Sequence, residues 1–272
     1  MAEIDGKSIS HKILDRLRSQ AQRLQVKPRL VVMMVGTNPA TVKYVERKGQ
    51  ACKYVGIDFY LHKFPNDVPT GQLVAEIERA QMSADAVIVQ LPLPKSLDQG
   101  AVLDAIKVNK DADCLSSTAI GRVLRGSAKI LPPTVAAVME ILNMKRVNLK
   151  GKSVVVVGQG ELVGKPLAAL FANQPVTLTV CGEGTKDLAS HTKKADVLIS
   201  GTGVPHLIRA NMVKKGTVVI DAGVKVVKGK VVGDVDWKKI VNKAKLVTPT
   251  PGGLGPITVA KLLENVITLA QP

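Results

Sequence analysis

Two side chains in the first third of the sequence are the first candidates for proton chemistry. Tyr44 and Lys48 are four residues apart, so a helix would place them on one face. The ordinary pKa of lysine is about 10.4, which makes it a poor base near neutral pH. Burial would have to lower that pKa before the amine could exchange protons. Taken alone, the pair is better explained as an ordinary exposed helix surface.

Three further segments place polar groups or unusual backbone where ligands bind. Gln90 to Pro94 follow a predicted strand, and the carboxyl ends of parallel strands line the ligand crevice of open α/β sheets. The carboxylates Asp111 and Asp113 come further along the chain. Pro251 to Pro256 are too rich in glycine and proline for a plain linker, so we expect a shaped loop over a site.

A glycine-rich turn in the second half predicts a dinucleotide site. It follows a short valine strand and precedes a predicted helix, so glycine backbone and helix N–H groups would meet a pyrophosphate. Its Gly-x-Gly-x-x-x-Gly spacing is one residue longer than the common fingerprint and also fits a tight structural turn. The residues expected to contact the dinucleotide are Gly158, Gln159, Gly160, Val163, Gly164, Lys165, Glu183, Gly201, Thr202 and Gly203.

Glu183 bears on the choice of dinucleotide. It follows the second strand of this half, where an acidic residue accepts hydrogen bonds from the adenosine ribose and repels a 2′-phosphate. This favours NAD over NADP, although a solvated loop glutamate is the alternative. Gly201 to Gly203 follow the next strand, and we expect them beside the nicotinamide half.

The elements that position these residues alternate along the chain. We expect strands at Leu30 to Val35, Asp58 to Lys63, Ala86 to Gln90, Ser153 to Val157, Thr177 to Cys181, Val197 to Ser200 and Thr217 to Ala222. Helices are expected at Ile9 to Gln25, Asn38 to Val55, Thr70 to Gln81, Thr134 to Met144 and Thr258 to Gln271. Such alternation predicts parallel sheets with right-handed crossovers.

The predicted fold is therefore α/β with two domains. An N-terminal three-layer α/β domain with a parallel sheet would comprise residues 1–138 and the C-terminal helix 256–272. An NAD(P)-binding Rossmann domain would comprise residues 139–255. We expect a cleft between the two domains.

Composition narrows the class of protein. The 272 residues carry a formal net charge of +16, but the basic residues are dispersed, which favours an acidic small molecule over nucleic acid. The apolar runs are too short for a membrane span, and the first ten residues lack a signal-peptide core. The three cysteines form no Cys-x-x-Cys pair, which argues against disulfides and a metal site and fits a reducing cytoplasm: Cys52, Cys114 and Cys181.

Over nearly its whole length the sequence resembles the methylenetetrahydrofolate dehydrogenase/methenyltetrahydrofolate cyclohydrolase family. The matching blocks are Tyr44-Val45-x-x-Lys48, Gln90 to Pro94, Lys110 to Asp113, Val163 to Leu167, Gly233 to Asp236 and Thr248 to Thr258. Any one block could match by chance, but the second and last together are highly specific. The resemblance implies an enzyme of one-carbon metabolism that oxidises methylenetetrahydrofolate with NAD(P) and hydrolyses methenyltetrahydrofolate to formyltetrahydrofolate.

The resemblance also implies roles for single residues. Lys48 would be the general acid and base in hydrolysis, and Tyr44 would stack on or position the folate. Gln90 would hold Lys48 and help to keep part of it neutral. The pterin-anchoring aspartate of the family falls on Asp113, whose carboxylate can bind the amino-pyrimidine edge. The expected substrate contacts are Tyr44, Leu91, Pro92, Pro251, Gly252, Gly253 and Pro256.

Three departures from the family pattern matter. Gly158-Gln159-Gly160 replaces Gly-Arg-Ser, and Gly182-Glu183 replaces His-Ser. These changes remove partners for a 2′-phosphate, so we expect NAD although NADP is the commoner cofactor of the family. Cys114-Leu115 replaces Gly-Phe, which puts the geometry of the Asp113 loop in doubt. Pro132 to Ala137 replace Pro-Cys-Thr-Pro-x-Gly, which would alter the entry to the following helix.

Other functions remain open at this point. A Rossmann oxidoreductase of the shikimate or amino-acid dehydrogenase type would share the cofactor turn but need not carry the other blocks. A divergent paralogue with low activity and a basic nucleic-acid or scaffold protein are further alternatives. For the leading hypothesis we expect folate substrates whose polyglutamyl tails the positive charge attracts. We also expect a homodimer and a cytoplasmic location.

Overall fold

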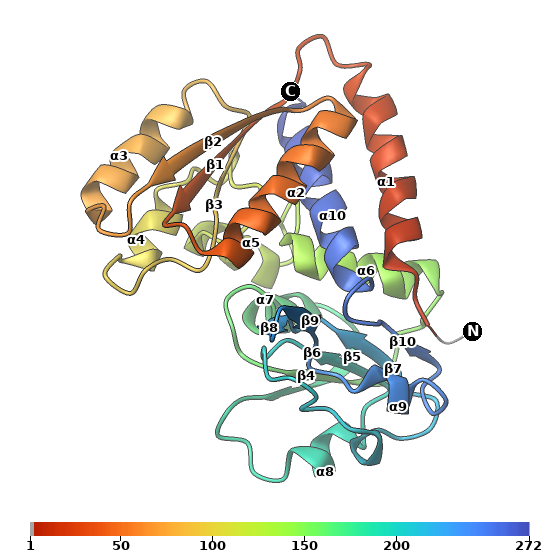
Figure 1. Ribbon diagram of the computed structural model, residues 1–272. Coiled ribbons are helices and arrows are strands. Elements are labelled where there is room, and N and C mark those ends of the chain that lie inside the picture. Colours follow the sequence, from red (N-terminus) through yellow and green to blue (C-terminus); the bar gives the residue numbers. More distant parts are fainter. Residues whose placement is uncertain (1–2, 272) are drawn as a thin grey trace. The chain divides into compact units, whose positions relative to one another are not determined.

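The computed structural model describes residues 3–271 and divides the chain into two compact units (Figure 1). The three-strand unit comprises His11–Arg122, Ser127–Pro133 and the chain from Val259 onward. The five-strand unit comprises the chain up to Ser10, Val123–Gly126 and Thr134–Thr258. Helices α1 (Gly6–Ala21) and α10 (Leu254–Leu269) each contribute to both units. The domain boundaries expected from the sequence remain a prediction.

The three-strand unit is built on a parallel sheet in the order β2-β1-β3. Its strands are β1 (Arg29–Val35), β2 (Asp58–Phe64) and β3 (Ala86–Val89). All of β1 after Arg29 is buried, as expected of a central parallel strand covered on both faces. The connecting helices are α2 (Pro39–Val55), α3 (Thr70–Ala80) and α4 (Gln99–Asp104), followed by α5 (Ser117–Leu124).

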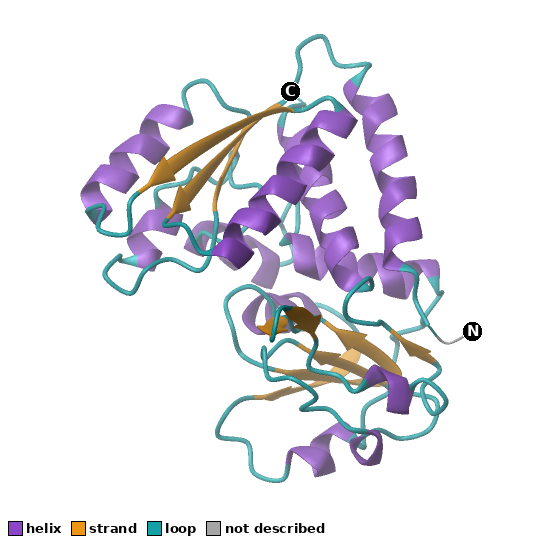
Figure 2. Cartoon of the chain, viewed as in Figure 1, coloured by secondary structure: helices purple, strands orange, loops and turns teal. Residues whose placement is uncertain are grey.

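One face of this sheet packs on α3 and α4 to form a hydrophobic core. Met33 of β1 and Val89 of β3 are paired in the sheet and pack with Leu73 and Ile77 of α3 and Val102 of α4. All five side chains are at most 1% exposed. Figure 2 shows the strands of this unit between α3 and α4 on one side and α2 on the other. The core therefore fixes the ends of β1 and β3, where side chains can reach a ligand.

Local signals set both ends of α2, the helix that carries Tyr44 and Lys48. The side chain of Asn38 accepts hydrogen bonds from the backbone N–H groups of Ala40 (2.9 Å) and Thr41 (3.4 Å), and Pro39 takes the first helical position. Gly56 ends the helix in the left-handed region with φ of 93°. The start and end predicted for this helix are confirmed.

The five-strand unit contains a parallel sheet in the order β10-β7-β6-β4-β5. Its strands are β4 (Lys152–Val157), β5 (Val176–Cys181), β6 (Val197–Ser200), β7 (Val218–Asp221) and β10 (Leu246–Val247). Its helices are α6 (Pro133–Met144), α7 (Gly164–Phe171), α8 (Leu188–Thr192), α9 (Trp237–Ile240) and the 3-10 turn Ala210–Met212. The strand order reverses between β4 and β6, and in open α/β sheets ligands bind at such a switch point.

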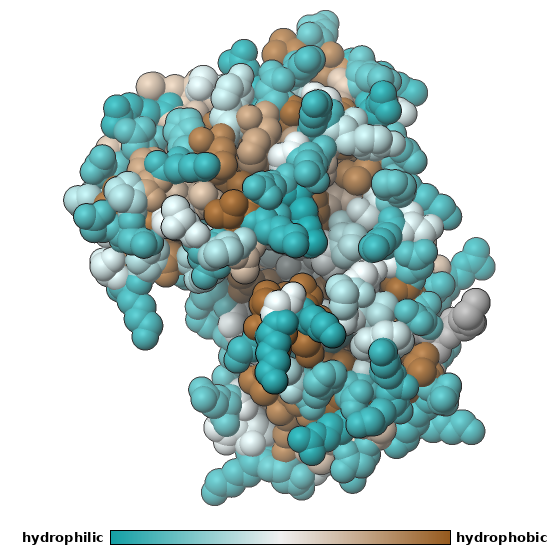
Figure 3. Space-filling model, in the orientation of Figure 1, coloured by the Kyte–Doolittle hydropathy of each residue, from teal (hydrophilic) through white to brown (hydrophobic). Residues whose placement is uncertain are grey.

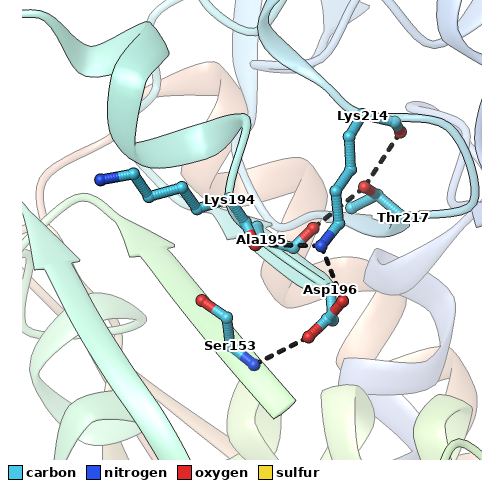
Figure 4. A network of polar contacts seen from close by, with 6 residues as sticks. All are labelled: Ser153, Lys194, Ala195, Asp196, Lys214 and Thr217. Atoms are coloured by element: carbon cyan, nitrogen blue, oxygen red, sulfur yellow. Dashed lines mark hydrogen bonds and ion pairs between the residues drawn. The ribbon is translucent and has the colours of Figure 1, made fainter.

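At the amino ends of these strands a polar network ties the chain together (Figure 4). The carboxylate of Asp196 accepts a hydrogen bond from the backbone N–H of Ser153 at 2.9 Å and pairs with Lys214 at 2.7 Å. The hydroxyl of Thr217 donates to the carbonyls of Ala195 and Lys214, both at 3.0 Å. The bond from Lys214 holds the pKa of Asp196 below its ordinary value. The polar groups at the amino ends of these strands thus hydrogen-bond to one another.

A small antiparallel hairpin was not foreseen from the sequence. Its strands are β8 (Lys225–Val227) and β9 (Lys230–Val232), and they follow the carboxyl end of β7. Val224 and Val226 are 61% and 51% exposed, and Figure 3 shows hydrophobic surface over this part of the unit. A two-stranded hairpin that buries so little is marginal on its own, so its stability depends on how its base is held.

Several predicted bounds differ from the structure. Helix α1 begins at Gly6 and ends at Ala21, and α10 begins at Leu254 rather than Thr258. Pro256, which we expected in a loop, therefore lies in the first turn of α10, where the missing N–H of proline costs nothing. The short strand β10 was also missed. Within residues 3–271, no helix is both long and apolar enough to cross a membrane.

Candidate functional site

In the three-strand unit a nearly buried lysine faces the end of β3. Lys48 is 5% exposed, and its Nζ donates a hydrogen bond to Oε1 of Gln90 at 3.0 Å. The Nε2 of Gln90 donates to the carbonyl of Leu91 at 2.7 Å, which fixes the orientation of the amide. Nζ also lies 5.2 Å from the centre of the Tyr44 ring. The predicted group of Tyr44, Lys48 and Gln90 is brought together.

Burial dominates the charge state of this group. It lowers the pKa of Lys48, while the charge of Asp113 and then Cys52 oppose this shift. Burial raises the pKa of Asp113, and the charge of Lys48 pulls it back. Burial also raises the pKa of Tyr44 to about 12, so its phenol stays protonated at neutral pH. The arrangement can exchange a proton through Lys48 at a pH below the ordinary lysine range.

The geometry corrects one detail of the role expected for Gln90. Its Oε1 accepts the hydrogen bond from Lys48, and such an acceptor favours the charged ammonium rather than the neutral amine. Gln90 therefore orients Lys48, and the lowered pKa comes from burial.

The two aspartates of the following loop have different surroundings. Asp111 is 1% exposed, and its Oδ2 accepts hydrogen bonds from the backbone N–H groups of Leu115 (3.0 Å) and Ser116 (2.8 Å). Burial raises the pKa of Asp111 to about 6, and its bonds with Ser116 oppose the shift. Asp111 thus shapes the loop, which leaves Asp113 as the carboxylate that interacts with Lys48.

This loop keeps its turn without the glycine of the family pattern. Cys114 has φ of 55°, a left-handed conformation that glycine adopts more readily. The side chain of Asn265 in α10 donates to the carbonyls of Ala112 and Leu131, both at 2.8 Å. Sequence reasoning missed Asn265, because nothing in the spacing links it to a loop about 150 residues earlier.

In the five-strand unit, the glycine-rich turn packs closely on the turn that follows β6. A Cβ on Gly158 would lie 2.6 Å from the carbonyl oxygen of Gly201. One on Gly201 would lie 2.4 Å from Cγ1 of Val163, and one on Gly164 would lie 2.0 Å from the carbonyl oxygen of Gly158. Only glycines fit these contacts, which hold two predicted cofactor turns together at the switch point. Gly203, in the same second turn, has φ of 73°.

The backbone of Gly160 is open where the other glycines are packed. It is exposed, and no heavy atom lies within 4 Å of the position of a Cβ. Helix α7 begins four residues later, and no side chain caps its N-terminus. Backbone N–H groups and the positive end of a helix are the features that bind a pyrophosphate.

Two segments that depart from the family pattern, those of Gln159 and Gly182, lie side by side. A Cβ on Gly182 would be 2.2 Å from Oε1 of Gln159, so the glutamine side chain packs over the residue before Glu183. Glu183 itself is exposed. Lys165 is also exposed and pairs with Glu161 one turn earlier. The structure thus brings Gln159 next to the segment of Glu183, whose carboxylate is predicted to face the adenosine ribose.

The glycine- and proline-rich segment before α10 is held in the same unit by the start of α1. A Cβ on Gly6 would lie 1.7 Å from the carbonyl oxygen of Gly253, and the hydroxyl of Ser10 donates to the carbonyl of Pro256 at 2.9 Å. Gly252 has φ of 103°, and Pro251 precedes it in the loop. These predicted substrate contacts lie in the five-strand unit, whereas Leu91 and Pro92 lie in the three-strand unit.

Two buried carboxylates escaped sequence reasoning. Asp221 at the end of β7 is 2% exposed and Asp234 after β9 is 1% exposed. Burial raises the pKa of Asp221 to about 7, and the charge of Asp234 adds to the shift while backbone bonds oppose it. Asp234 belongs to the Gly233 to Asp236 block, but that motif gave no sign of its partners. No cluster of three His, Cys, Asp or Glu residues suited to a metal ion occurs in the described chain.

Two family models together match most of this chain. The catalytic domain of tetrahydrofolate dehydrogenase/cyclohydrolase matches residues 4–113. The NAD(P)-binding domain of the same enzymes matches residues 132–272.

Individual relatives agree over the full length. The bifunctional protein FolD of Nautilia profundicola is 42% identical over 100% of this chain and 98% of its own. The crystal structure of the bifunctional enzyme FolD from Campylobacter jejuni has a TM-score of 0.95 at 36% identity and covers 98% of both chains. The Trypanosoma brucei enzyme, solved with NADP and an inhibitor, has a TM-score of 0.93 at 34% identity and covers 98% of this chain and 96% of its own.

Two glycines of the turn offer a matched test of its packing. Gly164→Ala would place a methyl group 2.0 Å from the carbonyl oxygen of Gly158, whereas the methyl group of Gly160→Ala would meet no protein atom. We expect Gly164→Ala to lower the free energy of unfolding by about 2 kcal/mol or more, as overpacking does, and Gly160→Ala to leave it nearly unchanged. Urea denaturation measures both. Equal stability of the two variants would contradict the close contact.

Proposed function

The chain belongs to the tetrahydrofolate dehydrogenase/cyclohydrolase family, and we propose that it catalyses two consecutive steps of one-carbon metabolism. It oxidises methylenetetrahydrofolate to methenyltetrahydrofolate with a nicotinamide dinucleotide and hydrolyses the methenyl product to formyltetrahydrofolate. The observation that carries this function is the buried Lys48, hydrogen-bonded to Gln90 at 3.0 Å and electrostatically coupled to Asp113. Membership of the family argues against the shikimate-type and nucleic-acid alternatives.

In hydrolysis, Lys48 is the group that moves protons. A water molecule adds to the methenyl carbon, and the neutral amine of Lys48 accepts a proton from it. The resulting ammonium then gives a proton to the folate nitrogen as its bond to that carbon breaks. The hydroxyl on the carbon loses its remaining proton to solvent at the same time, which leaves the formyl group on the other nitrogen. Burial lowers the pKa of Lys48 and so favours its neutral amine. Gln90 holds Nζ in place.

The remaining residues of this site bind and orient the folate. Asp113 accepts two hydrogen bonds from the amino-pyrimidine edge of the pterin, and Tyr44 positions the ring beside Lys48. Leu91 and Pro92 follow Gln90 directly and contact the substrate. Pro251, Gly252, Gly253 and Pro256 are the further contacts that we propose, and they lie on the five-strand unit.

The residues of the five-strand unit fit a nicotinamide dinucleotide, which when bound accepts a hydride from the methylene carbon. The open backbone of Gly160 and the uncapped start of α7 suit its pyrophosphate. Gly201, Thr202 and Gly203 contact the nicotinamide half. No acid or base of the protein is required in this step, because the folate nitrogens stabilise the cation that forms. The task of these residues is to orient the reacting partners.

Replacement of Lys48 tests the hydrolytic mechanism. We expect Lys48→Met to lower the rate of methenyltetrahydrofolate hydrolysis at least about a hundredfold, because general acid–base catalysis is lost. Lys43→Met, on an exposed position of the same helix, is the control and should keep the rate. In the unaltered enzyme the rate should rise with pH below the ordinary lysine range, because burial lowers the pKa of Lys48. Full hydrolysis by Lys48→Met would remove Lys48 from the mechanism.

We propose NAD as the preferred dinucleotide. Gln159 and Gly160 offer no cation for a 2′-phosphate, and the carboxylate of Glu183 repels one. Titration of methylenetetrahydrofolate oxidation with each dinucleotide should give a higher kcat/KM for NAD. The double variant Gln159→Arg with Glu183→Ser should shift the preference toward NADP. Turnover by the unaltered enzyme with NADP alone would show that Glu183 does not exclude the 2′-phosphate.

The substrate in the cell is proposed to carry a polyglutamyl tail. The net charge of +16 attracts such an acidic tail. Dissolved salt screens this attraction. We expect kcat/KM for a polyglutamyl folate to fall more steeply with added salt than kcat/KM for the monoglutamyl form. An identical salt dependence for both would reject this steering.

Three further proposals rest on the resemblance and the composition. We propose a homodimer in a cytoplasmic location, and domains formed by residues 1–138 with 256–272 and by residues 139–255.

A further inference from the structure

The base of the β8–β9 hairpin is closed by the carboxylate of Asp221. Its Oδ1 accepts hydrogen bonds from the backbone N–H groups of Gly223 (3.0 Å) and Asp234 (3.1 Å), and its Oδ2 accepts one from Val235 (3.1 Å). Gly223 precedes the hairpin, and Asp234 and Val235 follow it. Asp221 therefore ties the two ends of this exposed segment to the carboxyl end of β7.

Asp234 makes a second set of bonds, to the turn after β6. Its Oδ2 accepts hydrogen bonds from the hydroxyl of Ser200 at 2.8 Å, and from the backbone N–H and the hydroxyl of Thr202 at 2.6 and 2.9 Å. Its Oδ1 is the only buried side-chain nitrogen or oxygen in the described chain that has no hydrogen-bond partner. All three bonds thus converge on one oxygen.

The turn held by Asp234 is in direct contact with the glycine-rich turn. Gly201 lies between the two bonded residues Ser200 and Thr202, and its backbone packs on Gly158 and on the side chain of Val163. A displacement of this turn would therefore move the backbone that meets the dinucleotide. The bonds of Asp234 to Ser200 and Thr202 thus reach Gly158 and Val163 through the contacts of Gly201.

We propose that Asp234 is a positioning residue for the nicotinamide dinucleotide, which holds the Ser200–Thr202 turn against the Gly158 turn and so sets the affinity for the cofactor. This inference rests on the proposed function, because it assumes that the two turns bind a dinucleotide. The burial of Asp234 fits this role: a carboxylate that is 1% exposed is costly unless hydrogen bonds compensate, and those bonds come from this turn.

All three hydrogen bonds of Asp234 are accepted by Oδ2. A substitution can therefore remove the negative charge of Asp234 and keep its hydrogen bonds. In Asp234→Asn the amide oxygen can take the place of Oδ2 and keep all three donors, while the NH₂ group replaces the unpartnered Oδ1. Asp234→Ala removes the acceptor and leaves Ser200 and Thr202 without it. Asp236→Asn is the matched control, because Asp236 lies two residues further along and pairs with Lys239.

The experiment measures dissociation constants of NADH and NADPH from their fluorescence, with the full-length protein and no folate. We expect Asp234→Ala to raise the dissociation constant of the preferred dinucleotide about tenfold or more, with Asp234→Asn and Asp236→Asn within about threefold of the unaltered protein. In steady-state assays the KM for the dinucleotide should rise in Asp234→Ala while the KM for the folate stays the same. A purely structural role would lower the melting temperature without this selective effect.

Two smaller changes keep the test decisive if Asp234→Ala does not fold. Ser200→Ala and Thr202→Val each remove one hydroxyl donor to Asp234, and both leave the bond from the backbone N–H of Thr202 in place. Together they should raise the dissociation constant about fivefold. Unchanged dinucleotide affinity in folded Asp234→Ala, or in the double variant, would overturn the role of Asp234 alone. Failure of the unaltered protein to bind either dinucleotide would instead overturn the proposed function.

Discussion

Burial of a lysine amine is the constraint on which the three-strand unit depends. A charged ammonium loses much of its hydration in such a place, and the surroundings of Lys48 compensate with one amide oxygen and one nearby carboxylate. Each partner needs its own support. Gln90 is oriented by the carbonyl of Leu91, and the loop of Asp113 is shaped by Asp111 and Asn265. Elements far apart in the sequence thus converge on one nitrogen atom.

The five-strand unit depends on a different constraint, which is the close contact between the Gly158 turn and the Gly201 turn. Gly158, Gly164 and Gly201 allow backbone to approach backbone, and no side chain could replace them without displacement. Contacts this tight fix position only if both turns are held from outside. The Asp221–Asp234 pair supplies this support from one side.

The part of the architecture that could be predicted is the part encoded locally. The ends of α2 are specified by bonds within a few residues, at Asn38, Pro39 and Gly56. Short apolar runs between helical segments located most of the strands. Helix spacing placed Tyr44 and Lys48 on one face, and the strand-end rule pointed to Gln90. That Gln90 holds Lys48 was predicted from the resemblance to the family. The acceptor role of Gln90 and the bonds of Asp234 could not be predicted, because they depend on the orientation of side chains from distant segments. The hairpin was missed because its valines are not alternately buried and exposed.

The interleaving of the two units has a consequence for how the chain forms. Helix α10 supplies Asn265, which donates hydrogen bonds to the carbonyl of Ala112, in the loop of Asp113, and to the carbonyl of Leu131, just before α6. Most of this helix belongs to the three-strand unit. During synthesis, the first sheet therefore emerges from the ribosome well before the helix that completes its surroundings. The surroundings of Lys48 can reach their final form only after the entire five-strand sheet has been translated.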